Sequence, residues 1–333
     1  MTIQFIAEIG VNHNGDLELA KAMTAAAISA GADIVKFQVA IPSEVVTASA
    51  PQADYQKINM GGSATQLQMI QDLMLSHAEF RELFDWCDEN AFSWSATAFD
   101  RASLELIEGY SIPFHKIPSG EVSNLPYVGL VARSSKPILL STGMCNLADI
   151  DEALRVIAAE RGGIDDVTLL QCTSNYPVSA EDVNLRVIKT LHDTFGVQVG
   201  FSDHTEGVVA ALGAIALGAS LIEKHFTLDR SLPGPDQVAS ATPVVFEELV
   251  KAGRYLEVAM GSPFKAITPS EMSTRKVATR SIVAARDIRV GERFTKENLA
   301  VKRPGGGISP KHLDVLVNLR ASKDFLQDDL IEW

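Results

Sequence analysis

Cysteine is scarce in this chain of 333 residues, which contains three, Cys87, Cys145 and Cys172, and no CxxC pair. Their odd number and wide spacing argue against a disulfide framework and favour free thiols in a reducing compartment. The sequence also lacks any apolar stretch near the roughly 20 residues of a membrane span. The run Ile3–Ile9 has no basic n-region or small-residue cleavage site beside it. We therefore expect a cytoplasmic protein without a signal peptide or a membrane partner.

The chain also has fewer basic than acidic residues. The chain has 29 Lys and Arg against 42 Asp and Glu, a net charge of −13, and no basic stripe or tail. This balance argues against a nucleic-acid partner. An anionic substrate would need a few local cations to offset the overall charge.

What the sequence does contain is a regular alternation of β-like runs and amphipathic helical patterns. The β-like runs are Phe5–Ile9, Ile34–Phe37, Phe92–Ala96, Phe114–Ile117, Ile138–Ser141, Val167–Gln171, Val197–Phe201 and Ser220–Lys224. The helical segments include Leu17–Ser29, Leu67–Asn90, Leu147–Ala159, Val208–Leu217 and Pro243–Met260. Eight β-then-α units predict a closed (β/α)₈ TIM barrel, with a doubly wound sheet as the alternative.

Reactive residue types at the ends of the β-like runs favour the barrel. They are Glu8, Lys36, Thr97, Lys116, Ser141, Cys172, Ser202 and His225. A barrel gathers its active site at the C-terminal ends of all its strands, whereas an open sheet gathers it at one switch point. We therefore expect one site at the mouth of a barrel.

The secondary-structure pattern of the sequence changes near the C-terminal end. Residues 261–276 lose helical periodicity, and short strand-and-turn patterns begin at Ala278. We therefore expect a barrel domain over residues 1–262, a linker over 263–277 and a small β-rich domain over 278–333. A domain of about 55 residues is marginal alone, so we expect it to dock on a barrel.

Two histidines and two lysines suggest the chemistry of the mouth. His204 and His225 end consecutive predicted strands, and neighbouring strands lie about 4.8 Å apart, so the pair could share a metal ion or simply hydrogen-bond. Lys36 and Lys116 end apolar runs, where they could bind phosphate or reach water as snorkelling side chains. Without a nearby thiolate, Mn²⁺ or Mg²⁺ suits the histidines better than structural zinc.

The motifs along the chain resemble those of the sialic acid synthase family, in the same order. They are AEIGVNHNG (7–15), VKFQ (35–38), KIPSGE (116–121), LSTGM (140–144), SDHT (202–205), EKHFT (223–227) and PGPD (233–236). The stretch RSIVAARDI followed by VKRPGGGISP is similar to the antifreeze-like (SAF) domain of the same family. The resemblance covers essentially the whole chain.

This resemblance implies condensation of phosphoenolpyruvate with an N-acylated mannosamine-type sugar and water, giving a nonulosonic acid and phosphate. It implies a divalent metal on His204 and His225, typically manganese, with Mg²⁺ or Co²⁺ as alternatives. The phosphoenolpyruvate ligands that it implies are Lys36, Thr97, Lys116, Ser119, Ser141, Ser174 and Ser202. Ser174 departs from the asparagine that the family often has there, and Asn175 follows it.

The resemblance also implies roles for carboxylates and for the small domain. Glu8 would contact the sugar, Glu121 would lie by the metal and a water, and Lys116 would complete the catalytic set. The further sugar contacts would be Tyr176, Asp236 and Arg303, the last reaching the partner subunit's barrel in a domain-swapped homodimer. From the residues alone, Glu8 and Glu121 could instead form salt bridges and Asp236 could cap a turn, and we interpret His13 as a loop histidine bordering the site.

The acyl sugar is not fixed by these patterns. We expect the N-acetylneuraminate type, with synthases of N,N'-diacetyllegionaminate, pseudaminate or a spore-coat sugar as alternatives. The segments ADYQK (53–57) and SNYP (174–177) look closer to the sialic and legionaminic types than to the pseudaminic type. A Schiff-base aldolase using Lys36 or Lys116, and a non-enzymatic sugar-binding protein, are the other classes.

Overall fold

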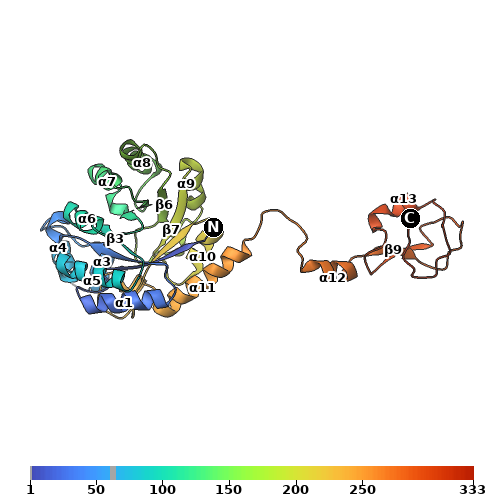
Figure 1. Cartoon of the computed structure of the whole chain (residues 1–333), viewed down its shortest axis with the longest axis horizontal. Coiled ribbons are helices and arrows are strands. Elements are labelled where there is room, and N and C mark those ends of the chain that lie inside the picture. Colours follow the sequence, from blue (N-terminus) through green and yellow to red (C-terminus); the bar gives the residue numbers. More distant parts are fainter. Residues whose placement is uncertain (1, 61–64) are drawn as a thin grey trace. The chain divides into compact units, whose positions relative to one another are not determined.

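The computed structural model describes residues 2–60 and 65–333, which divide into two compact units, Met1–Gly261 and Ser262–Trp333. The first unit is a ring of helices around parallel strands (Figure 1). Its strands are β1 Gln4–Gly10, β2 Ile34–Val39, β3 Trp94–Ala98, β4 His115–Ile117, β5 Ile138–Ser141, β6 Val167–Cys172, β7 Gln198–Asp203 and β8 Leu221–His225. The expected TIM barrel is confirmed, and the predicted strands agree with these to within about two residues.

The order of the strands explains the closure of the sheet. The ladder runs β3-β2-β1-β8-β7-β6-β5-β4, so β1 pairs with both β2 and β8. The two ends of this ladder, β3 and β4, lie side by side, and Ser95 Oγ donates a 2.7 Å hydrogen bond to the Phe114 carbonyl between them. All eight strands therefore direct their C-terminal ends to one mouth.

The covering helices pack one apolar face onto the sheet. They are α1 Leu17–Ser29, α5 His77–Glu89, α6 Arg101–Glu108, α7 Leu125–Ala132, α8 Leu147–Arg161, α9 Val187–Phe195, α10 Val209–Ala216 and α11 Pro243–Ala259. In α1, Asp16 caps the first turn by accepting from the N–H groups of Glu18 and Leu19, and Ala20, Met23 and Ala27 are buried. One core fills the space between helices and strands, and a smaller one fills the barrel interior.

The connection between β2 and α5 is longer than a barrel requires. Its described residues form three short helices, α2 Pro42–Val45, α3 Asp54–Met60 and α4 Gln66–Leu73. The single helix expected over Leu67–Asn90 is therefore wrong. Ser76 ends the run because it forms a capping box with Glu79, which starts α5 as a separate helix.

The second unit contains α12 Glu271–Ala278, the antiparallel strands β9 Ser281–Ala284 and β10 Leu299–Lys302, and α13 Leu313–Leu316. It has its own small core, which includes Ile282, Phe294 and Phe325. The linker expected over 263–277 thus contains most of a helix. Its residues are exposed and leave no apolar face for a periodicity search, but the Glu271 side chain accepts from the Thr268 N–H and begins the helix. No helix among the described residues is both long and apolar enough to span a membrane.

Candidate active site

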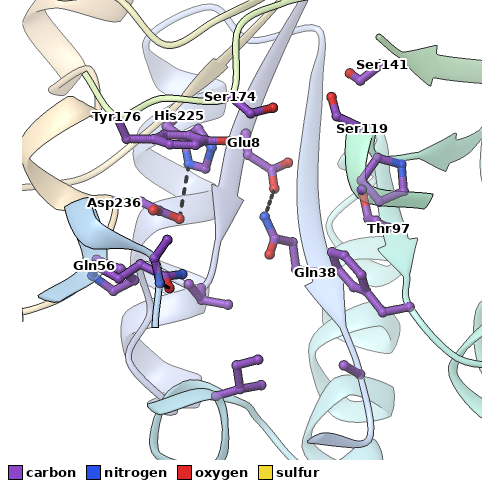
Figure 2. A pocket seen from close by; sticks show the side chains of 18 of the residues that line it. Glu8, Gln38, Gln56, Thr97, Ser119, Ser141, Ser174, Tyr176, His225 and Asp236 are labelled. Carbon is purple, nitrogen blue, oxygen red and sulfur yellow. Dashed lines mark hydrogen bonds and ion pairs between the residues drawn. The ribbon is translucent and has the colours of Figure 1, made fainter. Parts of the chain in front are cut away.

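A cavity of about 480 Å³ opens at the mouth of the barrel. It is a volume suited to small-molecule ligands. Side chains from the strand ends and from the loops that follow them point into it (Figure 2). It brings together Glu8, Lys36, Thr97, Lys116, Ser119, Ser141, Ser174, Tyr176, Ser202, His204, His225 and Asp236.

Two lysines and two glutamates form a buried charge cluster at the base of this cavity. Lys36 Nζ lies 2.5 Å from Glu8 Oε2 and 3.7 Å from Glu223 Oε2, while Lys116 Nζ lies 2.6 Å from Glu223 Oε1. All four side chains are almost inaccessible to solvent. Buried charges persist only when they are paired, so Glu223 is the counter-ion that both lysines share.

The electrostatics of the cluster keep Glu223 ionised. Burial alone would raise the pKa of Glu223, but Lys116 and Lys36 lower it far below its ordinary value. Burial lowers the pKa of Lys36, yet the carboxylates of Glu223 and Glu8 bring it above its ordinary value. Burial lowers the pKa of Lys116. Both lysines have carboxylate partners, which stabilise their ammonium forms, and this effect outweighs burial at Lys36 but not at Lys116. The free amine that Schiff-base chemistry requires is therefore disfavoured at Lys36.

Hydroxyl groups surround the loop after β5. Ser119 Oγ accepts a 2.9 Å hydrogen bond from the Gly143 N–H, and a Cβ placed on Gly143 would lie 2.3 Å from Ser174 Oγ. Ser141 Oγ is buried and makes no hydrogen bond with any described residue. Hydroxyl donors, a backbone N–H and a residue without a side chain form a cradle that suits a phosphate group.

The two predicted histidines lie next to each other on the opposite side of the cavity. The ring centroids of His204 and His225 are 5.5 Å apart. His204 Nδ1 is 2.8 Å from the Thr173 carbonyl oxygen, which can only accept, so Nδ1 carries a proton and the lone pair of the neutral ring is on Nε2. This is the arrangement in which an imidazole ligates a metal through one nitrogen while the other nitrogen orients it.

A carboxylate and a tyrosine complete the histidine side. Asp236 Oδ2 lies 4.0 Å from His225 Nδ1, a contact marked in Figure 2, and burial raises the pKa of Asp236 to about 6. Burial and the neighbouring His204 hold the pKa of His225 well below its ordinary range. The Tyr176 ring lies 4.0 Å from the His204 ring, centroid to centroid.

The residues on this side fit a divalent ion by donor type. His225 Nδ1 and Asp236 Oδ1 are buried without a hydrogen-bond partner among the described residues. Imidazole and carboxylate donors suit Mn²⁺ or Mg²⁺. Within residues 2–60 and 65–333, no three His, Cys, Asp or Glu side chains are grouped closely enough to hold an ion, so water or substrate oxygens would have to complete its shell.

The connection after β2 forms a mainly apolar wall of the cavity. Its larger aliphatic members are Val45, Val46, Met69, Ile70, Leu73 and Met74, and Tyr55, Gln56 and Gln66 of the same connection also line the cavity. The connection between β2 and α5 contacts the histidine side of the site at two points. Tyr55 packs against Tyr176 with centroids 4.9 Å apart, and Asn59 Nδ2 donates to the Pro235 carbonyl at 2.6 Å.

Two predicted site residues lie elsewhere. Glu121 does not line the cavity, because its side chain accepts a 2.6 Å hydrogen bond from Asn124 within the turn that follows Ser119. Arg303 is exposed on the second unit, so its action across a dimer stays a prediction. His13 is fully buried outside the cavity lining, and its Nδ1 accepts from the Gly15 N–H at 3.2 Å.

The sequence reasoning missed Glu223 and Gln38. Glu223 stands two residues before His225 on β8, and alternate residues of a strand share a face, so the EKH motif contained the signal. Gln38 stands two residues after Lys36 in the same way, and its Nε2 donates to Glu8 Oε1 at 2.9 Å. Cys172 also lines the cavity.

Comparison with known proteins identifies the family of the chain. A model of the NeuB family matches residues 23–265, and a model of the SAF domain matches residues 279–333. The N,N'-diacetyllegionaminic acid synthase of Campylobacter jejuni is 41% identical over 326 residues, covering 98% of both chains. The enzyme of the same name from Legionella pneumophila is 40% identical over 335 residues, covering 100% of this chain and 94% of that one.

Among solved structures, the spore coat polysaccharide biosynthesis protein SpsE of Bacillus subtilis matches with a TM-score of 0.65 and 34% identity. The match covers 100% of this chain and 94% of that chain. The family model spans most of the first unit and the relatives span the whole chain. The chain therefore belongs to the NeuB family and carries a SAF domain at its C-terminal end.

Proposed function

We propose that this enzyme condenses phosphoenolpyruvate with an N-acylated amino sugar and water to form a nonulosonic acid and inorganic phosphate. One observation carries the proposal. Two buried lysines and a hydroxyl cradle face a pair of histidines across one cavity of about 480 Å³ in a NeuB-family chain. The cationic side suits the phosphate and carboxylate of phosphoenolpyruvate, and the histidine side suits the sugar.

We assign phosphoenolpyruvate to the side formed by Lys36, Lys116 and the Gly143 loop. An incoming trianion or dianion would compete with Glu223 and Glu8 for the two ammonium groups. The ammonium groups would then offset negative charge on the phosphate as the C–O bond breaks. Ser119 and Ser174 would orient the phosphate oxygens from the other side of Gly143.

We assign the open-chain sugar to the side formed by His204, His225, Asp236 and Tyr176. Mn²⁺ held by the two histidines would supply Lewis-acid polarisation of the sugar's aldehyde oxygen. Asp236 would accept from a sugar hydroxyl. A carboxylate must also orient the water that adds at C2. Glu8 lines the cavity, whereas Glu121 would reach it only after giving up its bond to Asn124.

We propose 2,4-diacetamido-2,4,6-trideoxymannose as the sugar, which makes the product N,N'-diacetyllegionaminate. Two relatives named for that product are about 40% identical over nearly the whole chain. A 6-deoxy sugar with two acetamido groups has three methyl groups, and the apolar wall of Met69, Ile70 and Leu73 would bury methyl groups favourably. N-acetylmannosamine, with a hydroxyl at C6, is the alternative.

The deciding experiment measures phosphate release from phosphoenolpyruvate by the EDTA-treated full chain after Mn²⁺ is added back. Each sugar is supplied separately. We expect metal-dependent release with the trideoxy sugar at a higher kcat/KM than with N-acetylmannosamine. Faster release with N-acetylmannosamine would reassign the product to N-acetylneuraminate, and no release with any amino sugar would overturn the proposed activity. Borohydride treatment in the presence of pyruvate, whose ketone could form a Schiff base with a lysine, should leave the protein mass unchanged.

A further inference from the structure

A second buried ion pair lies directly behind the two histidines. Lys224 Nζ is 2.7 Å from Asp203 Oδ2, and the two side chains are 1% and 0% exposed. Neither residue lines the cavity. Each is the residue immediately before a histidine, Asp203 before His204 and Lys224 before His225.

The pair occupies the outer, apolar face of the barrel. Side chains alternate along a strand, so Glu223 and His225 face the cavity while Ile222 and Lys224 face the helices. Phe201 and Ile222, two residues before Asp203 and Lys224, belong to the core between sheet and helices. A full ion pair in this layer carries a large desolvation cost, and apolar residues in its place often maintain or increase stability. Stability alone therefore does not explain it.

The contacts of the pair converge on the backbone around His204. Lys224 Nζ donates to the Thr205 carbonyl at 2.6 Å. Asp203 Oδ1 accepts from both the backbone N–H and the hydroxyl of Thr205, at 2.8 and 2.7 Å. The contacts thus fix both neighbours of His204, because Asp203 precedes it and Thr205 follows it. Lys224, the other member of the pair, precedes His225.

The position of the pair in the sheet adds a second constraint. Asp203 and Lys224 are register partners, and they form the last pair of the ladder between β7 and β8. The register has no further pair beyond them, so the next residues along the two strands, His204 and His225, are not register partners. The ion pair thus joins the two strands at the end of their ladder, one residue before each histidine.

We infer that Asp203 and Lys224 are positioning residues that set the separation and orientation of His204 and His225 for a shared divalent ion. This inference rests on the metal pair of the proposed function. Partners that orient metal ligands commonly contribute 10- to 100-fold to metal affinity. The pair acts through the backbone and touches neither substrate nor metal.

The test uses the full chain and Mn²⁺ alone, with free Mn²⁺ measured by electron paramagnetic resonance. The variant Asp203→Leu/Lys224→Met replaces the pair with apolar side chains. Glu247→Gln/Lys251→Met removes an exposed ion pair on α11 and is the matched control. We expect a Kd for Mn²⁺ about 10-fold or more higher in the first variant, and the wild-type Kd in the control. A folded first variant with the wild-type Kd would overturn the inference.

Two further measurements keep the result decisive. If the double variant does not fold, Asp203→Asn keeps the shape of the side chain and weakens the bond to Lys224. It should raise the Kd as well, and an unchanged Kd would count against positioning. If the wild-type chain binds no Mn²⁺, the metal pair of the proposed function fails by itself. The NMR chemical shifts of the ring nitrogens of His204 and His225 then test positioning without a metal. Positioning requires these shifts to change in the Asp203/Lys224 variant and to stay unchanged in the control.

Discussion

Lys116 on β4 and Glu223 on β8 form an ion pair across the barrel mouth, with 2.6 Å between Nζ and Oε1. The two strands lie far apart in the sheet order, so the contact spans the base of the cavity. Glu223 also accepts from Ser202 Oγ at 3.0 Å. The anionic side chain thus occupies the position where the two lysines would bind an anionic substrate.

Glu223→Gln should lower the unfolding temperature of the protein without phosphate. It should also increase the rise in unfolding temperature that added phosphate causes. The substitution leaves two buried ammonium groups short of a counter-ion, a cost of about 3 kcal/mol or more. Inorganic phosphate would replace the lost charge, so its addition should raise the unfolding temperature more than in wild type. Thermal unfolding with and without phosphate measures this. Glu121→Gln, outside the cavity, is the control, and equal phosphate responses in the two variants would contradict the prediction.

Gly143→Ala should weaken the binding of phosphoenolpyruvate. The added Cβ would lie 2.3 Å from Ser174 Oγ and 2.9 Å from Ser119 Oγ, so both hydroxyls would have to move. We expect the KM for phosphoenolpyruvate to rise about 10-fold, which is about 1.4 kcal/mol of lost binding, and the KM for the sugar to change little. Gly163→Ala, with nothing within 4 Å of its Cβ, is the matched control. An unchanged KM for phosphoenolpyruvate would show that its phosphate does not bind beside Gly143.

The strands and their reactive ends were predictable because a barrel strand is short, apolar and followed by a polar residue. That pattern predicts Lys36, Lys116 and His225 in one mouth, and all three line the cavity. Glu223 was overlooked because its strand position precedes the terminal residue, although its two-residue spacing from His225 marks the same face.

Side-chain choices and local caps account for most of what was not predictable. Glu121 follows Ser119 in the KIPSGE motif, but its hydrogen bond to Asn124 depends on a side-chain rotamer that the sequence pattern does not predict. The break between α4 and α5 depends on Ser76, a single capping residue inside a continuous amphipathic pattern. The apolar wall after β2 depends on how α2, α3 and α4 pack at the mouth, which periodicity does not determine.

His13→Gln should reduce the loss of stability in acid. Burial lowers the pKa of His13 to about 4 in the folded chain, against about 6.5 when unfolded. Between these values the unfolded chain binds a proton that the folded chain does not, so stability falls as the pH drops from 6.5 toward 4. This one group should contribute about 2.5 kcal/mol of loss between pH 7 and 4.5.

Urea unfolding at pH 7 and at pH 4.5 measures the His13 effect as a difference between proteins. Carboxylates also titrate in this range, but they do so equally in wild type and variant. The exposed imidazole of His192 provides the control variant His192→Gln. The same loss of stability in wild type and His13→Gln would show that the His13 ring is not held neutral by burial.

Ile70→Asn should shift the preference of the enzyme from the 6-deoxy sugar toward N-acetylmannosamine. Ile70 lies in the apolar wall with Met69 and Leu73, and an amide there would be left without a partner beside a methyl group but could pair with a hydroxyl. The ratio of kcat/KM for the two sugars should change about 10-fold. Ile58→Asn provides the control, because Ile58 is 79% exposed on α3 and lies outside the cavity lining. A lower kcat/KM for both sugars in equal proportion would mean that the wall supports the mouth without selecting the sugar.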